Sequence, residues 1–409
     1  MFTPEKLEEL RTQNRARSIE TIKRVRAEAN ATESSGAPDG PGDTAREPGG
    51  SEQRVKAIKL EDELKLLKYY QTRIQHICRG MSFPVKVQAT AISFLKRFYL
   101  SFSSLDHDPK NIMLTVIYLA GKAEESYISA EEFCRVVKQD QQAVLRNELA
   151  VLQGLKFDLV VYNPYRPLEG FFQDLEEWRT DPEGGCPDAQ LQKAEAAHIT
   201  KAKQAAKAAV DALMLTDAPL LFSPGQIALA ALRSGFRAAE LSSASYLARV
   251  AKQAPQAGGA ADAGGPEARL EQLKAALASI DVFGAAGAKP VNDDEVRKID
   301  RRLKACHNPL LDPESAAYKR AQQQQDKEQR HNRELKVQAR HAATQAAEAQ
   351  LLGMSAHVTQ ANGQHALPTI SEGQPAALAE PAADLGSMDV PEGQPAKRRK
   401  SEDQKGLLH

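Results

Sequence analysis

The chain has 409 residues, 42% of them apolar, and its 54 lysines and arginines equal its 54 aspartates and glutamates. This length leaves room for two or three domains, and the balanced charge creates no overall field that would attract nucleic acid or an anionic membrane. No window reaches the roughly 18 consecutive apolar residues that span a bilayer, and the N-terminus lacks an apolar signal core. We therefore expect a soluble, intracellular protein.

The four cysteines are widely spaced: Cys78, Cys134, Cys186 and Cys306. They form no CxxC pair, and no histidine lies at zinc-finger spacing, which argues against a structural metal site and against a disulfide framework. We expect four thiols in a reducing compartment and no bound metal.

The N-terminal segment predicts a helix that docks on another surface. Thr3 and Pro4 suit the N-cap and the first helical position, and a narrow apolar stripe follows among many charges: Leu7, Leu10, Ile19, Ile22 and Val25. Residues 31–51 have too few large apolar side chains to offset chain entropy, which predicts a disordered insertion. We expect a docking helix over residues 1–30, separated by this insertion from the globular body.

Residues 52–162 predict a first set of five helices. The start signals are Leu60, Pro84, Asp108 with Pro109, Ser129 and Asp140, and the last helix ends near Gly154. Asp108 and Pro109 are a good N-cap and first helical residue, and the helix that they open is apolar enough to be the central buried one. Ser129 and Glu132 match a capping box for the short fourth helix.

Residues 163–285 predict a second set, with residues 253–268 as an inserted loop. Pro109-x-x-Ile112-x-Leu114 recurs as Pro224-x-x-Ile227-x-Leu229, which suggests a duplication. Ser223 would cap the second copy, and Gly235 would stop it. Residues 286–309 predict a C-terminal helix that opens at Asn292, and residues 310–409 a polar helix followed by a disordered tail from Gly353.

Two ionisable residues interrupt helices that are otherwise almost wholly apolar. Lys122 lies in LTVIYLAGKAEES and Glu148 lies in NELAVLQGLKFDL. Lysine and glutamate are seldom buried without partners, so we expect both charges at the rim of an interface, held by another protein rather than by each other. The alternative is an ion pair between the two on adjacent helices.

These two segments resemble the cyclin box, and within the cyclin family they resemble the cyclin H branch. Further motifs occur in the family's order and cover most of the predicted helices: ELKLLKYYQTRI, FLKRFYL, NPYRP and LTDAPLLFSPGQIAL. The resemblance implies an all-helical fold of two five-helix cyclin repeats, flanked by N- and C-terminal helices, with disordered insertions and a disordered tail.

The resemblance also implies a regulatory subunit that activates a cyclin-dependent kinase. Its implied setting is the CDK-activating kinase complex associated with transcription factor IIH, in cell-cycle and RNA polymerase II transcription control. The implied partners are the kinase catalytic subunit, a RING-finger assembly factor and the core of transcription factor IIH, with no direct nucleic-acid contact and no membrane. By position, the kinase-binding residues would be Lys122, Glu148, Leu119, Leu152, Phe157 and Leu159.

The C-terminal tail contains a short basic run. Lys397, Arg398, Arg399 and Lys400 follow Pro395 and resemble a monopartite nuclear import signal. Together with the resemblance to a nuclear cyclin, this run predicts a protein of the nucleus.

Three other functions would require features that this sequence lacks or would lack features that it has. A transcriptional cyclin of the C, K, L or T type would share the box but should lack the LTDAPLLFSPGQIAL segment and the docking helices at both ends. A DNA-binding factor of the IIB type should carry an N-terminal zinc ribbon and a basic second repeat, and neither is visible. No Gly-rich phosphate loop, HExxH motif or nucleophile elbow occurs, so we expect no enzymatic activity and no cofactor.

One motif of cell-cycle cyclins is absent. Their Met-Arg-Ala-Ile-Leu substrate-docking patch has no match in the corresponding ELKLLKYYQ segment. We therefore do not expect docking of Arg-x-Leu substrates.

Overall fold

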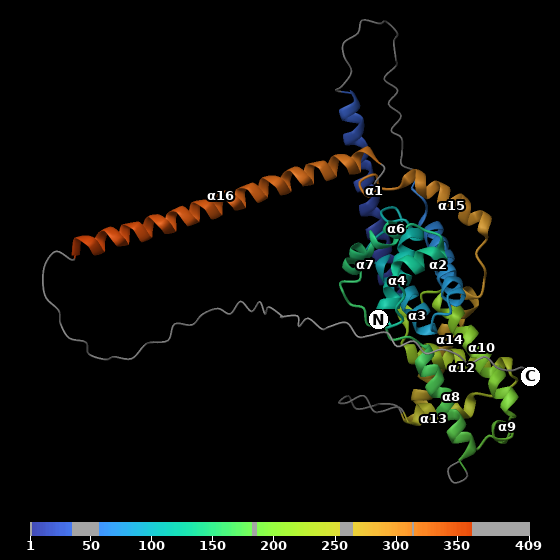
Figure 1. The fold of residues 1–409 in the computed structure, drawn as a ribbon. Coiled ribbons are helices and arrows are strands. Elements are labelled where there is room, and N and C mark those ends of the chain that lie inside the picture. The colour runs from blue at the N-terminus through green and yellow to red at the C-terminus, as the bar shows by residue number, and fades with distance from the viewer. Residues whose placement is uncertain (1, 35–56, 182–185, 254–264, 313–314, 362–409) are drawn as a thin grey trace, which may run out of the picture. The chain divides into compact units, whose positions relative to one another are not determined.

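The computed structural model describes residues 2–34, 57–181, 186–253, 265–312 and 315–361 (Figure 1). Every regular element in these ranges is an α-helix, which confirms the predicted fold class. The chain divides into two compact units, residues 1–331 and residues 332–409. Within the described ranges, no helix combines the length and the apolar character needed to cross a bilayer.

Helix α1 (Pro4–Ser34) begins at the predicted proline, and the Lys6 backbone N–H donates to the Thr3 hydroxyl at 3.3 Å. Its apolar stripe docks on the globular body of its own chain, since Leu7, Ile22 and Val25 are buried. The helix continues four residues beyond the predicted boundary at residue 30. The boundary is wrong because residues 31–34 contain no glycine or proline, the residues that most strongly end a helix.

The first repeat consists of α2 (Leu60–Gly80), α3 (Val85–Phe98), α4 (Pro109–Ala123), α5 (Ala130–Val137), α6 (Gln141–Leu145) and α7 (Glu148–Gly154). As predicted, α4 is the buried central helix, and the Asp108 carboxylate caps it by accepting from the Lys110 backbone N–H at 2.9 Å. Ser129 caps α5 in the same way, by accepting from the Glu132 backbone N–H at 3.1 Å, which is one half of the predicted capping box. The predicted fifth helix is divided into α6 and α7 at Arg146 and Asn147.

The second repeat consists of α8 (Tyr165–Thr180), α9 (Ala189–Gln192), α10 (Ala196–Met214), α11 (Ala218–Leu221), α12 (Pro224–Ala238), α13 (Ala244–Gln253) and α14 (Pro266–Gly287). Ser223 caps α12 as predicted, and Gln226 completes a capping box that was not predicted. Residues 266–268 were expected in the inserted loop, but they form the first turn of α14, which Pro266 opens. Proline suits a first turn because its missing N–H would have no helical partner there.

Gly235 does not stop α12. It lies within the helix, where an added Cβ would be 2.2 Å from the Ala202 carbonyl oxygen of α10. The prediction of a C-terminal stop is wrong because a close helix crossing and a helix end both favour a residue without a side chain.

The remaining helices are α15 (Asp293–Cys306) and α16 (Ala316–Ala361), and α16 runs from the first compact unit into the second. Asn292 caps α15 as predicted, by accepting from the Asp294 backbone N–H at 2.9 Å. Helix α16 continues past Gly353, where the disordered tail was expected to begin, and reaches Ala361. Residues 362–409, including the predicted import signal at Lys397, lie outside the described part of the chain.

Candidate functional site

The first feature of the candidate site is the pair of charges on α4 and α7. Lys122 lies in the last turn of α4 and Glu148 is the first residue of α7, so each charge has the sign that the nearby helix end favours. The Lys122 Nζ donates a hydrogen bond to Glu148 Oε1, and it also lies 4.7 Å from the centroid of the Tyr118 ring. Both side chains remain partly exposed.

The expectation that a partner, rather than the chain itself, holds these two charges is therefore wrong for the isolated protein. The ends of α4 and α7 lie close enough for the two side chains to meet, and a partly buried charge is costly without a partner. Such a pair contributes at most about 1 kcal/mol to folding. An ammonium has three donors and a carboxylate about four acceptor positions, so one mutual bond leaves capacity for further contacts.

The four apolar residues predicted to flank the pair differ in how much surface they expose. Leu119 is buried in the core with 4% of its surface exposed, so it offers a partner almost nothing in this conformation. Leu152 and Leu159 are partly buried against the same core. Phe157 is 64% exposed and is the one member of the four with a large accessible surface.

Phe157 also has an uncommon backbone conformation. Its φ is +57°, next to Lys156 at +55°, and its N–H donates to the Leu152 carbonyl at 2.9 Å. Left-handed conformations are strained for a bulky residue and occur frequently at functional sites. The turn after α7 therefore presents an aromatic ring to solvent at a cost in folding free energy.

Three further exposed apolar residues lie near these positions in the sequence. Leu149 is 59% exposed, Val160 is 66% exposed and Tyr162 is 82% exposed. The sequence does not single out Leu149 or Val160, because exposure depends on which face of a short helix or turn meets the core. One sequence signal could have indicated their exposure: apolar residues continue after Gly154, where the helix ends.

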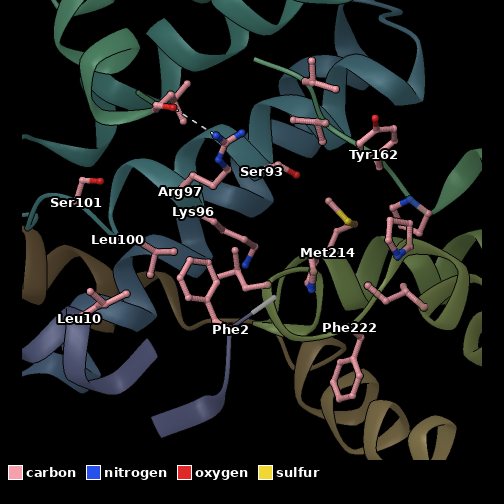
Figure 2. Close-up of a pocket in the computed structure, with 18 of the residues that line it drawn as sticks. Phe2, Leu10, Ser93, Lys96, Arg97, Leu100, Ser101, Tyr162, Met214 and Phe222 are labelled. Carbon is pink, nitrogen blue, oxygen red and sulfur yellow. Dashed lines mark hydrogen bonds between the residues drawn. The ribbon is translucent and has the colours of Figure 1, made fainter. Parts of the chain in front are cut away.

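A groove of about 650 Å³ lies beside this turn, in the first compact unit (Figure 2). Its walls come from the start of α1, from α3, from residues 154–164 and from the α10–α12 region. Figure 2 shows Phe2 and Leu10 on one side and Tyr162 and Met214 on the other. The Arg97 guanidinium fastens the wall formed by residues 154–164, donating to Asp158 Oδ2 at 2.9 Å and to the Leu155 carbonyl at 3.4 Å.

The described side chains offer no metal site. Among the residues that the structure describes, no group of three or more histidine, cysteine, aspartate or glutamate side chains could hold a metal ion. All four cysteines are buried thiols outside any disulfide. The candidate site consists of the Lys122–Glu148 pair, the exposed apolar residues that follow it in the sequence, and the groove beside the turn after α7.

Comparison with known proteins assigns both helical repeats. The model of the cyclin N-terminal domain matches residues 56–160, and the model of the cyclin C-terminal domain matches residues 163–285. Cyclin-H1-1 of Arabidopsis thaliana is 39% identical over 233 residues, which cover 57% of this chain and 66% of that protein. Cyclin CCL1 of Saccharomyces cerevisiae is 32% identical over 235 residues, which cover 56% of this chain and 54% of that protein.

These alignments span less than two thirds of the length of both relatives. Among solved structures, a chain of the CAK complex from Chaetomium thermophilum bound to ATP-gamma-S is similar to this chain with a TM-score of 0.56 and 21% identity. The match covers 80% of this chain and 90% of that chain. This likeness supports the fold.

Proposed function

The chain belongs to the cyclin family, and on this basis we propose that it binds and activates a cyclin-dependent kinase as a regulatory subunit, without catalytic groups of its own. The observation that carries the proposal is the location of the exposed apolar residues. They follow Glu148 in the sequence, from Leu149 to Tyr162, and all but Tyr162 lie in the repeat that matches the cyclin N-terminal domain. The similarity to Cyclin-H1-1 supports the cyclin H branch.

The mechanism follows from what a kinase needs in order to be active. A glutamate of its C-helix must pair with the strand lysine that holds the ATP phosphates. A subunit that binds this assembled state better than the displaced state shifts the equilibrium between them. A shift from 1:99 to 99:1 requires roughly 5.5 kcal/mol of differential affinity.

The exposed apolar residues can supply much of this free energy. Leu149, Phe157 and Val160 are each about two thirds exposed. Complete burial of such a side chain is worth roughly 1.5–3 kcal/mol, so burying the remaining surface of all three contributes roughly 3–5 kcal/mol. The ion pair would add directional contacts that set the register of the complex.

We propose the groove as the binding site for a second partner, which the family resemblance implies is a RING-finger assembly factor. The groove is mainly apolar, and Tyr162 is a largely exposed aromatic residue on its wall. Lys156 and Val160 also line it, so an occupant would lie directly beside the proposed kinase-binding turn. Association with the core of transcription factor IIH and a nuclear location remain predictions.

The direct test is purification of the tagged full chain from cells of its source organism. Mass spectrometry should then identify a cyclin-dependent kinase catalytic subunit in near-equal amount. Recovery of the chain without any kinase, under conditions in which the chain remains folded, would refute the proposal.

A further inference from the structure

Helix α1 contacts both repeats. Its Leu7 is buried in a small cluster with Leu100, which follows α3, and Leu220 of α11. The Phe2 backbone N–H donates to the Leu220 carbonyl at 3.1 Å, and Asn14 Nδ2 donates to the Leu100 carbonyl at 2.6 Å. The first part of α1 therefore lies across the seam between the repeats.

A bidentate ion pair joins α1 to the second repeat. The two terminal nitrogens of Arg11 donate to the two carboxylate oxygens of Asp217 at 2.8 and 2.7 Å. Burial alone would raise the pKa of Asp217, but the Arg11 hydrogen bonds and the charge of Lys96 lower it below its usual value. The carboxylate is therefore held in its charged form, and Arg11 is its direct partner.

Residues 216–217, the turn that contains Asp217, also accept a hydrogen bond from the first repeat. Lys96 of α3 is almost fully buried, and its Nζ donates to the Thr216 carbonyl at 2.6 Å. Burial lowers the pKa of Lys96 to about 8, while Asp217 acts in the opposite direction. One turn thus receives a cation from α1 and another from α3.

A second group of polar contacts lies in the last turn of α10, just before this turn. The Asp211 carboxylate accepts from Arg79 of α2 at 2.8 Å and from Gln88 of α3 at 3.0 Å, and it also accepts from the Tyr165 hydroxyl. Side chains of the first repeat and of α8 therefore hydrogen-bond to the C-terminal end of α10. These hydrogen bonds orient the two repeats relative to one another.

The helix that covers this joint also forms part of the groove. Phe2, Lys6 and Leu10 of the N-terminal segment all line the groove. Figure 2 shows Phe2 and Leu10 on the side opposite Tyr162. The side of the groove that α1 supplies thus depends on α1 remaining docked.

We propose that docking of α1 completes the groove, and that Asp217 is the positioning residue that holds α1 there through Arg11. The role of the groove as a binding site for a second partner rests on the proposed function. The dependence of the groove on α1 docking is independent of that function. Because coupling between sites is reciprocal, a partner that contacts both walls would also stabilise the docked helix.

The test is hydrogen exchange on the full-length protein without any partner. Arg11→Ala should increase exchange of the α1 amides in residues 4–18 by about a hundredfold, because it removes two charge-assisted hydrogen bonds from a partly buried carboxylate. Asp217→Asn should act in the same direction. Arg17→Ala, which truncates an exposed arginine on the same helix, should leave exchange unchanged.

A second measurement reports on the groove itself. Met214 is buried and lines the groove, whereas Met113 is buried in α4 away from it. Oxidation of Met214 by hydrogen peroxide should accelerate in Arg11→Ala, with Met113 unchanged as the internal control. Equal acceleration at both methionines would indicate general unfolding and would overturn the proposal for that variant.

A conservative substitution separates pairing from a general loss of packing. Arg11→Lys keeps the positive charge that Asp217 pairs with, so it should keep part of the protection that Arg11→Ala removes. Wild-type exchange of α1 in Arg11→Ala, or exchange in Arg11→Lys as fast as in Arg11→Ala, would overturn the proposal. Neither result depends on a kinase, so failure here leaves the proposed function standing, and failure to recover a kinase leaves this inference standing.

Discussion

The turn after α7 allows a prediction in which stability and binding respond differently to the same substitutions. Phe157 has a left-handed backbone and a ring that is 64% exposed. Replacement by alanine keeps the strained φ, whereas replacement by glycine relieves it. Glycine should therefore give the more stable protein by about 1 kcal/mol, the reverse of the usual order within a helix.

Both substitutions should weaken kinase binding equally, because both remove the ring. Burying the exposed two thirds of a phenylalanine is worth roughly 1–2 kcal/mol, so the dissociation constant should rise about 5- to 30-fold. Urea unfolding measures the stability of each variant, and calorimetric titration with the purified kinase subunit measures its affinity.

Glu240 is a matched control for the backbone effect. It has φ +59° after α12 in the second repeat, so Glu240→Gly should stabilise the chain without changing kinase affinity. If Phe157→Gly proves less stable than Phe157→Ala, the strain reasoning is wrong. If both Phe157 variants bind the kinase as tightly as the wild type does, the ring lies outside the interface.

Two other features give predictions about stability. Burial lowers the pKa of Lys96 to about 8 from 10.5, so between these pH values the unfolded chain binds more protons than the folded chain. The free energy of unfolding should therefore rise by up to about 3 kcal/mol over that range relative to Lys96→Met, as measured by urea unfolding at pH 7.5 and 10.5; a constant difference would contradict this. Gly235→Ala should destabilise the chain by about 2 kcal/mol or more, since its Cβ would meet the Ala202 carbonyl oxygen of α10. Gly170→Ala in α8, where no atom lies within 4 Å of the added Cβ, should instead stabilise the chain by about 0.5–1 kcal/mol, and equal melting temperatures for the two variants would count against the close crossing.

The helix starts were largely predictable because their signals are local. Asp108 and Ser223 each precede a proline and accept the capping hydrogen bonds that this pattern predicts. A cap requires side chains and backbone groups within three residues of one another. The sequence therefore contains nearly all the information that determines where α4 and α12 begin.

Contacts between distant segments were much harder to predict. Lys122 and Glu148 pair with each other because α7 begins beside the end of α4, and the helical pattern of either segment alone does not indicate this arrangement. The Arg11–Asp217 pair joins residues 206 positions apart and was not predicted. Charge identity is readable from a sequence, but the partner of a charge is set by tertiary packing.

The exposure of Phe157 shows a similar limit. Its aromatic character and its place in the cyclin motif are visible in the sequence, but its left-handed backbone is not. The same holds for Leu119, whose predicted role gave no indication of its burial. Assigning a residue to an interface by resemblance leaves open how much of its surface is available.

Kinase activation by the pair variant tests the central claim most directly. A purified cyclin-dependent kinase should gain activity with the wild-type chain and gain much less with Lys122→Ala combined with Glu148→Ala, while the helical content and melting temperature of that variant stay close to those of the wild type. The matched control is Lys65→Ala with Glu295→Ala, which removes a surface pair with a 2.6 Å contact elsewhere on the chain and should leave activation intact. No activation by the wild-type chain, or normal activation by the Lys122–Glu148 variant, would contradict the account.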